Sequence, residues 1–392
     1  MKLLIIFFYT CLINCAVAQT ESSKRGATDF FQKLEDKLNS YKTMSYQSHR
    51  ILHYASENYH TETEGPVFFD FTNPDTTIGF RYMVENPTLK AVFNGSETFF
   101  IDKTDSTITI SHKPQFAYTE SLPLLTNSII TLKKALPGII NDISIMKMIS
   151  DTLISNKEFL VASFTLENKT LSSLGYYTPI TLKRLFYYKV IIDPDTFLPT
   201  QILQKNSAEP DDYILTAFTN ISSDISMLKQ ESWYYSTYLN KFKLSTPKQS
   251  KLIKANTNAP YWKGSYYHIN DTLTLNSFKG KVILLEFWIK NCGYCIAAVP
   301  SLNTLSKKYN SDEFSIIGIN RYDKKEDIHF FYEKNHPEFK TIIDDNGNIT
   351  KAYGIDGFPT VVLIDKKGVV LYAGGFDKEL IDKLLQKSFP NK

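Results

Sequence analysis

The spacing of hydrophobic and polar positions changes several times along the chain. Over residues 28–40 apolar side chains recur at every third or fourth position, which predicts a helix with one buried face. Beyond it the spacing becomes alternating, and a helical stretch over 122–149, broken at Pro137-Gly138, is the main interruption. The alternating segments predict strands over 67–71, 79–84, 107–110, 159–166, 185–192, 200–204 and 213–218.

Two further apolar runs, 91–93 and 98–101, flank Asn94-Gly95, whose residue types favour the tight turn of a β-hairpin. The first part of the chain is therefore expected to form a mostly antiparallel β-domain with a few helices. Its strand order and the hairpin over 188–204 resemble the LolA-like lipoprotein-carrier fold, which is found in exported bacterial proteins. That resemblance implies a half-barrel sheet curved around a cavity for an apolar ligand.

The composition changes over residues 244–260, which are polar and contain two prolines, as in a linker. Beyond them strands and helices alternate, beginning with a nearly continuous apolar run over 282–288 that is typical of a buried central strand. Strands are then expected over 314–319, 360–364 and 369–372, and helices up to about 309 and over 325–334 and 377–385. The predicted division is a signal peptide (1–18), a β-rich domain (19–245), a linker (246–260) and an α/β domain (261–392).

The first residues are typical of an export signal. Lys2 precedes an apolar run over 3–13 that is too short to span a bilayer, and Ala16-Val17-Ala18 fits a cleavage site before Gln19. A membrane anchor is the alternative to cleavage, and lipidation at Cys15 is another, although Asn14 is a poor neighbour for it. We expect an exported, periplasmic protein that associates with a membrane if it is lipidated.

Charge and cysteine usage narrow the chemistry. The net charge of +3 is too small to indicate a nucleic-acid partner. Of the four cysteines, Cys11 and Cys15 lie in the predicted signal, so Cys292 and Cys295 alone remain after cleavage. The mature chain is therefore not a disulfide-stapled scaffold, and its sulfur chemistry is confined to this one pair.

The pair Cys292-Gly-Tyr-Cys295 follows the apolar run and opens a predicted helix, with Gly-Phe-Pro-Thr at 357–360 downstream. This combination resembles the thioredoxin superfamily, and the segments 279–281 and 320–346 resemble its TlpA/ResA branch of exported thiol-disulfide oxidoreductases. The resemblance covers about a third of the chain. It implies a thioredoxin fold and exchange of electrons with the thiols and disulfides of other proteins.

Each cysteine has a physical reason for its position. Two intervening residues in a first helical turn let the sulfurs reach disulfide distance. Cys292 lies at the expected helix N-terminus, where free N–H groups favour the nucleophilic thiolate, and Cys295 lies one turn inside and resolves the mixed disulfide. Tyr294 stands where thioredoxin has proline. Because the two residues between the cysteines tune the potential, this departure leaves the redox direction open.

The resemblance implies further site residues. Glu286 matches a buried acid that exchanges a proton with the resolving thiol, and its apolar neighbours favour burial over a solvent-facing position. Pro359 matches a cis-proline beside the cysteines, and the backbone of Phe358 would pair with a substrate strand. Trp288 is expected to form core and active-site wall together. The predicted substrate-binding residues are therefore Trp288, Tyr294 and Phe358, and Glu286 and Pro359 join the two cysteines as predicted catalytic residues.

No metal site is expected. Zinc would need two further ligands beside the cysteine pair, and the chain has no second Cys-x-x-Cys. His49, His53 and His60 are interpreted as surface histidines because residues four apart in a strand are more than about 10 Å apart. The redox-active disulfide is then the only redox group, with no small-molecule cofactor.

The resulting hypothesis is a reductase that acts on client proteins and is recharged by an upstream redox protein. The preference for reduction comes from the TlpA/ResA resemblance. Three alternatives remain open. The first is a disulfide oxidase or isomerase, the second is a peroxidase of the related peroxiredoxin group, and the third is a carrier of an apolar ligand with an accessory redox domain.

Overall fold

The computed structural model describes residues 21–73, 76–112, 117–180, 183–226, 228–245, 251–267, 272–309 and 312–389. The predicted signal peptide, 1–18, lies outside these residues. The chain divides into two compact units, Met1–Thr246 and Pro247–Lys392. Within the described ranges no helix is long and apolar enough to cross a membrane.

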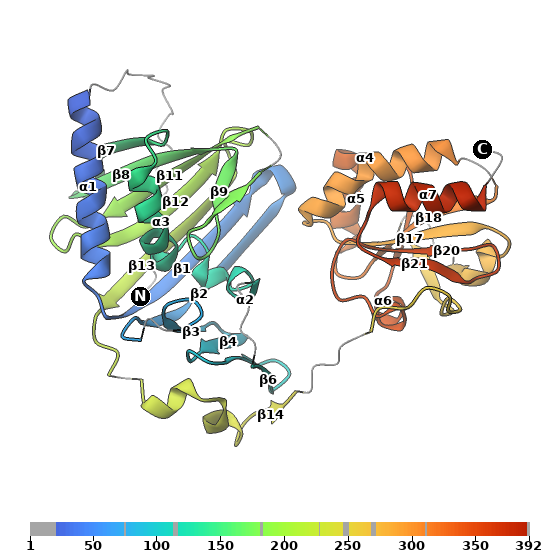
Figure 1. Ribbon diagram of the computed structural model, residues 1–392, viewed down its shortest axis with the longest axis horizontal. Helices are drawn as coiled ribbons and strands as arrows, with labels where there is room; N and C mark the ends of the chain where they lie inside the picture. Colours follow the sequence, from blue (N-terminus) through green and yellow to red (C-terminus); the bar gives the residue numbers. More distant parts are fainter. Residues whose placement is uncertain are drawn as a thin grey trace. The chain divides into compact units, whose positions relative to one another are not determined.

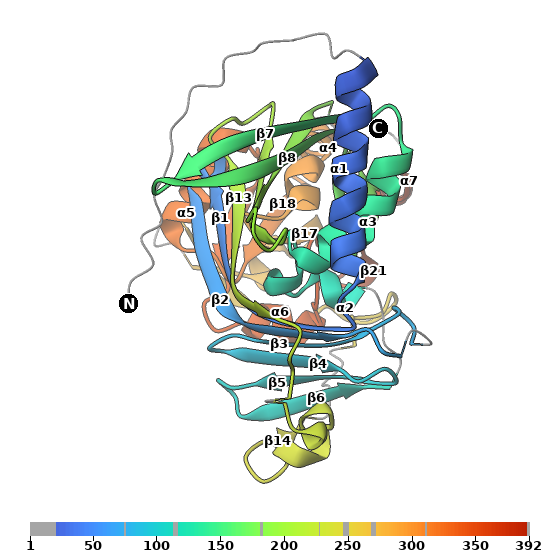
Figure 2. The ribbon, with the colours of Figure 1, turned by 90° about the vertical axis from the view of Figure 1, so that its left-hand side faces the viewer.

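The N-terminal unit is built on one large sheet that curves along its length (Figures 1 and 2). Its strand order is β14-β6-β5-β4-β3-β2-β1-β13-β12-β11-β8-β7, antiparallel except for the β14–β6 pair. The strands are β1 (Thr43–Tyr54), β2 (Tyr59–Asp70), β3 (Arg81–Glu85), β4 (Leu89–Phe93), β5 (Thr98–Asp102), β6 (Thr107–Ser111), β7 (Met146–Ile154), β8 (Lys157–Glu167), β11 (Leu185–Ile192), β12 (Pro199–Asn206), β13 (Tyr213–Ser222) and β14 (Lys243–Leu244). The short strands β9 (Lys169–Leu171) and β10 (Tyr177–Pro179) pair separately.

Helices α1 (Glu21–Asn39) and α3 (Ile129–Asn141) lie along one face of this sheet, which we call the inner face (Figure 2). Buried side chains of both helices, such as Leu34 and Leu136, form one apolar core with inward residues of the strands, such as Tyr46 and Phe218. The remaining short helices are α2 (Ala117–Glu120) and the 3-10 turns η1 (Ala55–Glu57), η2 (Pro123–Leu125), η3 (Gln230–Trp233) and η4 (Tyr235–Tyr238). The predicted β-rich domain is confirmed, whereas the likeness to lipoprotein carriers stays a prediction.

The helical prediction over 122–149 is wrong in two places. Helix α3 continues through Pro137, because a Ser128 capping box starts the helix and the buried Leu136 and Ile139 pack it into the core. The last residues belong instead to β7, where Met146 pairs with Thr165 of β8. Strand pairing with a distant segment outweighs the local helical pattern at this point.

The C-terminal unit is a seven-stranded sheet in the order β16-β15-β19-β18-β17-β20-β21. Strand β17 pairs in parallel with β18 and antiparallel with β20. The strands are β15 (Lys263–Tyr266), β16 (Thr272–Thr274), β17 (Val282–Trp288), β18 (Phe314–Asn320), β19 (Lys340–Ile343), β20 (Thr360–Ile364) and β21 (Val370–Gly374). The helices are α4 (Gly293–Lys308), α5 (Lys325–Asn335), α6 (Asn348–Tyr353) and α7 (Lys378–Ser388), with a 3-10 turn η5 (Leu275–Phe278).

Helices cover both faces of this sheet (Figure 1). Alternate residues of β17 explain the two layers, since Leu284 packs with α4 and α7 whereas Leu285 packs with α6. The segment 251–259, which its composition placed in the linker, is tied to this unit. Its backbone amides at Ile253 and Asn256 donate hydrogen bonds to Tyr353 and Val370, respectively.

Candidate active site

The candidate site lies at the carboxyl end of β17, where the central strand passes into α4. All seven residues of β17 are buried, which fixes the strand in the middle of the sheet. Glu286 and Trp288 have the same parity as Leu284, so they face the layer of helix α4. The chain then turns, and Cys292 becomes the N-cap of α4.

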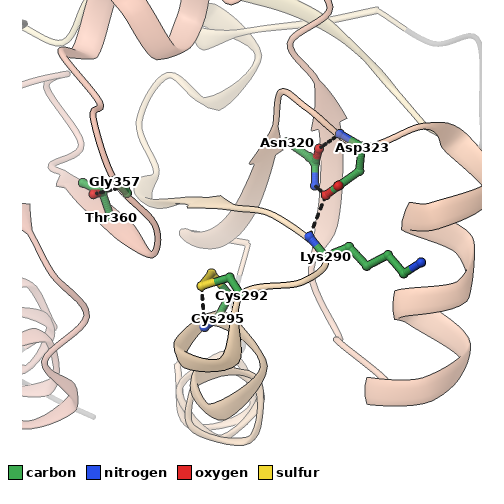
Figure 3. Close-up of a disulfide and its surroundings, with 7 residues drawn as sticks. All are labelled: Lys290, Cys292, Cys295, Asn320, Asp323, Gly357 and Thr360. Carbon is green, nitrogen blue, oxygen red and sulfur yellow. Dashed lines mark hydrogen bonds between the residues drawn. A yellow bond between two sulfur atoms is a disulfide. The ribbon is translucent and has the colours of Figure 1, made fainter. Parts of the chain in front are cut away.

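Cys292 and Cys295 are joined by a disulfide at the first turn of α4, with their Cα atoms 5.2 Å apart (Figure 3). The backbone N–H of Cys295 donates a hydrogen bond to Sγ of Cys292 over 3.1 Å. Cys292 is half-buried, whereas only 1% of Cys295 is exposed. A partner molecule can therefore reach Cys292, and the helix N-terminus stabilises negative charge on its sulfur.

Glu286 is a buried carboxyl in the strand that leads to the cysteines. Its exposed fraction is 1%, and its Oε2 atom has no hydrogen-bond partner. Burial raises the pKa of Glu286 to about 8, because the charged form loses its hydration and gains no counter-charge. A carboxyl of this kind is protonated at low pH and can give or take a proton near neutral pH.

Trp288 packs beneath the cysteine pair and is 1% exposed. It belongs to one apolar cluster with Cys295 and Phe331, and its indole N–H donates a hydrogen bond to Thr341 over 3.2 Å. Gly318 leaves room for it, since a Cβ there would lie 2.7 Å from Trp288 Nε1. Trp288 thus supports the site from within the core, and the substrate-facing wall predicted for it is not at the surface.

The peptide bond between Phe358 and Pro359 is cis. Pro359 lines a pocket of about 360 Å³ together with Tyr294, Ala297, Ala298, Gly375 and Phe376. Tyr294 is 82% exposed at its rim, and the half-buried Phe358 contacts the ring of Tyr322 at a centroid distance of 5.9 Å. The pocket is a surface beside the cysteines on which part of another molecule can rest.

The structure adds a polar network that the sequence reasoning missed (Figure 3). The backbone N–H of Lys290 donates to Asp323, whose carboxylate also accepts from the Asn320 amide. The Lys290 side chain is 2% exposed, and its ammonium pairs with the Asp327 carboxylate over 2.9 Å. These contacts attach the turn before Cys292 to β18 and α5. The sequence shows that Lys290 lies two residues before Cys292, but it does not show that Asp327 of α5 would be its partner.

The histidines that the sequence placed on the surface are closer together than expected. His60 lies directly opposite His53 across the β1–β2 pair, and their Nδ1 atoms are 3.2 Å apart. Glu62 accepts from His49 and His60. Even so, in the described part of the chain no group of three or more His, Cys, Asp or Glu residues could hold a metal ion.

Comparison with known proteins matches the C-terminal unit, which contains the cysteine pair. The Redoxin family model matches residues 254–379. The thiol-disulfide oxidoreductase ResA of Bacillus thuringiensis subsp. konkukian is 33% identical over 120 residues, which are 30% of this chain and 69% of that protein. The thioredoxin-like protein YneN of Bacillus subtilis is 29% identical over 117 residues, 29% of this chain and 68% of its own.

Among solved structures, a putative thiol:disulfide interchange protein DsbE from Chlorobium tepidum is 28% identical and has a TM-score of 0.33. The matched region is 35% of this chain and 99% of the Chlorobium tepidum chain.

The fold and the cysteine pair thus define a thioredoxin-fold redox enzyme. Through its C-terminal part the chain belongs to the ResA family of thiol-disulfide oxidoreductases. The predicted family, the fold of this domain and the class of activity are confirmed.

Proposed function

We propose that this oxidoreductase works as an exported reductase of disulfides in client proteins. The observation that supports the exchange chemistry is the pairing of a half-buried cysteine at a helix N-terminus with a shielded one, and the direction, reduction, is proposed from the resemblance to the TlpA/ResA branch. Cys292 is half-buried and accepts the amide of Cys295, whereas Cys295 is 1% exposed. This asymmetry supports a role for Cys292 as nucleophile and for Cys295 as resolving thiol.

The reaction follows from these roles. In the reduced enzyme the Cys292 thiolate attacks one sulfur of a client disulfide, forms a mixed disulfide and releases one client thiolate. The Cys295 thiol loses its proton and attacks Sγ of Cys292, which releases the second client thiolate. The client gains two electrons and takes up two protons, and the enzyme keeps the Cys292–Cys295 disulfide. An upstream redox protein returns two electrons to this pair.

Glu286 is the proposed acceptor of the Cys295 proton. Its raised pKa, about 8, supports this role, because a base should have a pKa near the working pH. The pocket lined by Tyr294 and Pro359 is proposed to hold the client segment next to the disulfide, and the backbone of Phe358 to pair with it. Trp288 contributes by supporting Cys295 from the core.

Export to the periplasm is proposed from the pattern of the first 18 residues, with membrane association if Cys15 is lipidated. The domain boundaries near residues 245 and 261 are proposed from the polar composition of residues 244–260. The division of the chain into two compact units after Thr246 supports the first of them, whereas the backbone hydrogen bonds of residues 251–259 attach that segment to the C-terminal unit.

The test is the equilibrium reduction potential of the Cys292–Cys295 pair, measured by thiol alkylation across a series of dithiol buffers. A value near about −270 mV, the level of thioredoxin, is expected for a reductase. A value near about −120 mV, the level of a strong oxidant, would overturn the reductase assignment and make the protein a disulfide donor or isomerase. Cys295→Ser serves as the control, since it cannot form the intramolecular disulfide.

A further inference from the structure

Three buried polar side chains lie next to one another on the inner face of the N-terminal sheet. Ser48 and Arg50 are alternate residues of β1 and therefore point to the same face, the one that also carries the core residue Tyr46. Thr216 of β13 lies directly opposite Arg50 in the antiparallel register. The exposed fractions are 2% for Ser48, 8% for Arg50 and 0% for Thr216.

These three side chains lack partners within the described ranges. The Nε of Arg50 and the hydroxyl oxygens of Ser48 and Thr216 are buried without a hydrogen bond. Burial lowers the pKa of the Arg50 guanidinium, and the phenols of Tyr54 and Tyr59 partly oppose that shift, with no carboxylate among the groups that act on it. An arginine nevertheless keeps its charge in a protein, so the site holds one uncompensated positive charge.

Arg81, a half-buried arginine on strand β3 of the same sheet, shows how the charge of a guanidinium can be compensated. Arg81 forms an ion pair with the Asp70 carboxylate, and its guanidinium also stacks on the Trp233 ring at 4.6 Å. Arg50 has neither kind of contact. Because an unpaired buried charge opposes folding, its retention beside two unpaired hydroxyls favours a role in binding.

We propose that Arg50, Ser48 and Thr216 form a binding site for the carboxylate of a small organic acid, independently of the redox reaction. A guanidinium presents parallel N–H donors that match the two oxygens of a carboxylate. The two hydroxyls can donate further hydrogen bonds to the same group. One positive charge fits a monoanion better than a phosphate or a dicarboxylate, which would bring excess negative charge into the core.

The side chains around the site indicate what the carboxylate is attached to. Ile202 lies opposite Thr216, and Phe218 lies opposite Ser48, both on the inner face and both 3% exposed. Ile214, 6% exposed, has the same parity as Thr216 along β13. These neighbours are apolar, so the acid is expected to carry a hydrocarbon group.

The test is calorimetric titration of the full-length oxidised protein with butyrate, with octanoate and with octanol. Both carboxylates should bind and the alcohol should not. Equal affinity for both acids identifies a small acid as the ligand, and tighter binding of octanoate identifies an acyl chain; each result supports the site. Absence of carboxylate binding at millimolar concentration would overturn it.

Arg50→Met is the decisive variant, and Lys189→Met, an exposed position on β11, is its matched control. Arg50→Met should weaken octanoate binding by about 10- to 100-fold, the loss of a charge-assisted contact, and Lys189→Met should not change it. Without ligand, Arg50→Met should unfold at a higher temperature than wild type. Unchanged affinity for octanoate in a folded Arg50→Met variant would contradict the proposal.

Ser48→Ala and Thr216→Val keep the guanidinium and serve if Arg50→Met does not fold. Each should weaken octanoate binding several-fold by removing one hydroxyl. Wild-type affinity in both variants would also count against the site.

Discussion

The two units of this protein each contain an ionisable side chain that is buried without a hydrogen bond at one of its polar atoms. In the C-terminal unit the carboxyl of Glu286 is such a group. In the N-terminal unit the guanidinium of Arg50 is the more buried of two arginines of this kind, the other being the half-buried Arg184. A carboxyl can become neutral by holding a proton, and burial accordingly raises the pKa of Glu286 to about 8. A guanidinium cannot become neutral, so Arg50 needs an anion from elsewhere. The same burial therefore favours proton transfer in one unit and ligand binding in the other.

The largest effect on activity should come from removing the nucleophile Cys292. A large loss of activity would show that the redox chemistry belongs to the C-terminal unit. Cys292→Ser should lower the rate of client disulfide reduction on the order of 10³-fold or more, because a hydroxyl does not replace the thiolate. Insulin reduction with a dithiol as electron donor measures it. Cys295→Ser should instead accumulate a mixed disulfide through Cys292, visible by mass spectrometry. Substantial turnover in Cys292→Ser would contradict the assignment of roles.

Glu286→Gln tests the proton-transfer side of the comparison. It should slow client reduction on the order of 100-fold near neutral pH, since the resolving thiol loses its proton acceptor. The wild-type rate should rise with pH up to about 8, where the carboxylate forms, and the variant should lack that rise. A variant with the wild-type pH profile would remove Glu286 from the reaction. Arg50→Met should leave both rate and profile unchanged.

The pH dependence of stability should separate the two buried groups. Between pH 4.5 and about 8 the folded protein keeps the Glu286 proton that the unfolded chain releases, so the free energy of unfolding falls as pH rises. Glu286→Gln should match wild type near pH 4 and exceed it by up to about 5 kcal/mol above pH 8. Arg50→Met should add stability equally at every pH. Denaturant unfolding of the oxidised forms gives both differences, and a constant gain for Glu286→Gln would show that its pKa is not raised.

Gly318→Ala tests the packing that supports the redox site. Its Cβ would lie 2.5 Å from Thr341 Oγ1 and 2.7 Å from Trp288 Nε1, so a cost of about 1–3 kcal/mol in unfolding free energy is expected. Gly293→Ala is the matched control, because a Cβ there meets nothing within 4 Å. Equal stability of the two variants in chemical denaturation would show that Trp288 can shift without cost.

The smallest effect is expected at the rim of the pocket. Tyr294→Ala should raise the KM for a client protein by about 2- to 5-fold and leave kcat nearly unchanged, since an exposed aromatic side chain contributes about 1 kcal/mol to binding. Steady-state kinetics on a folded client with one accessible disulfide gives the two constants. A fall in kcat at constant KM would move Tyr294 from client binding to the reaction itself.

The sequence patterns that predict the redox site are local. The apolar run, the cysteine spacing and the downstream Gly-Phe-Pro-Thr lie in short segments, and the structure brings Cys292 and Pro359 to one end of the sheet with Glu286 buried in β17. Local patterns failed where distant pairing dominated. The helical spacing over 122–149 did not reveal that its end pairs with β8, nor that α3 would continue through Pro137.

The sequence alone thus determined the class of chemistry, since two cysteines two residues apart at a helix start need only one turn of backbone to meet. It also determined the β-rich character of the first domain, through alternating apolar positions. Only the tertiary structure decided which side chains share a site across long distances. The contact of Lys290 with Asp327, and the position of Thr216 opposite Arg50, depend on helix packing and strand register. Register is fixed by the burial of a whole face, which no local stretch of sequence contains.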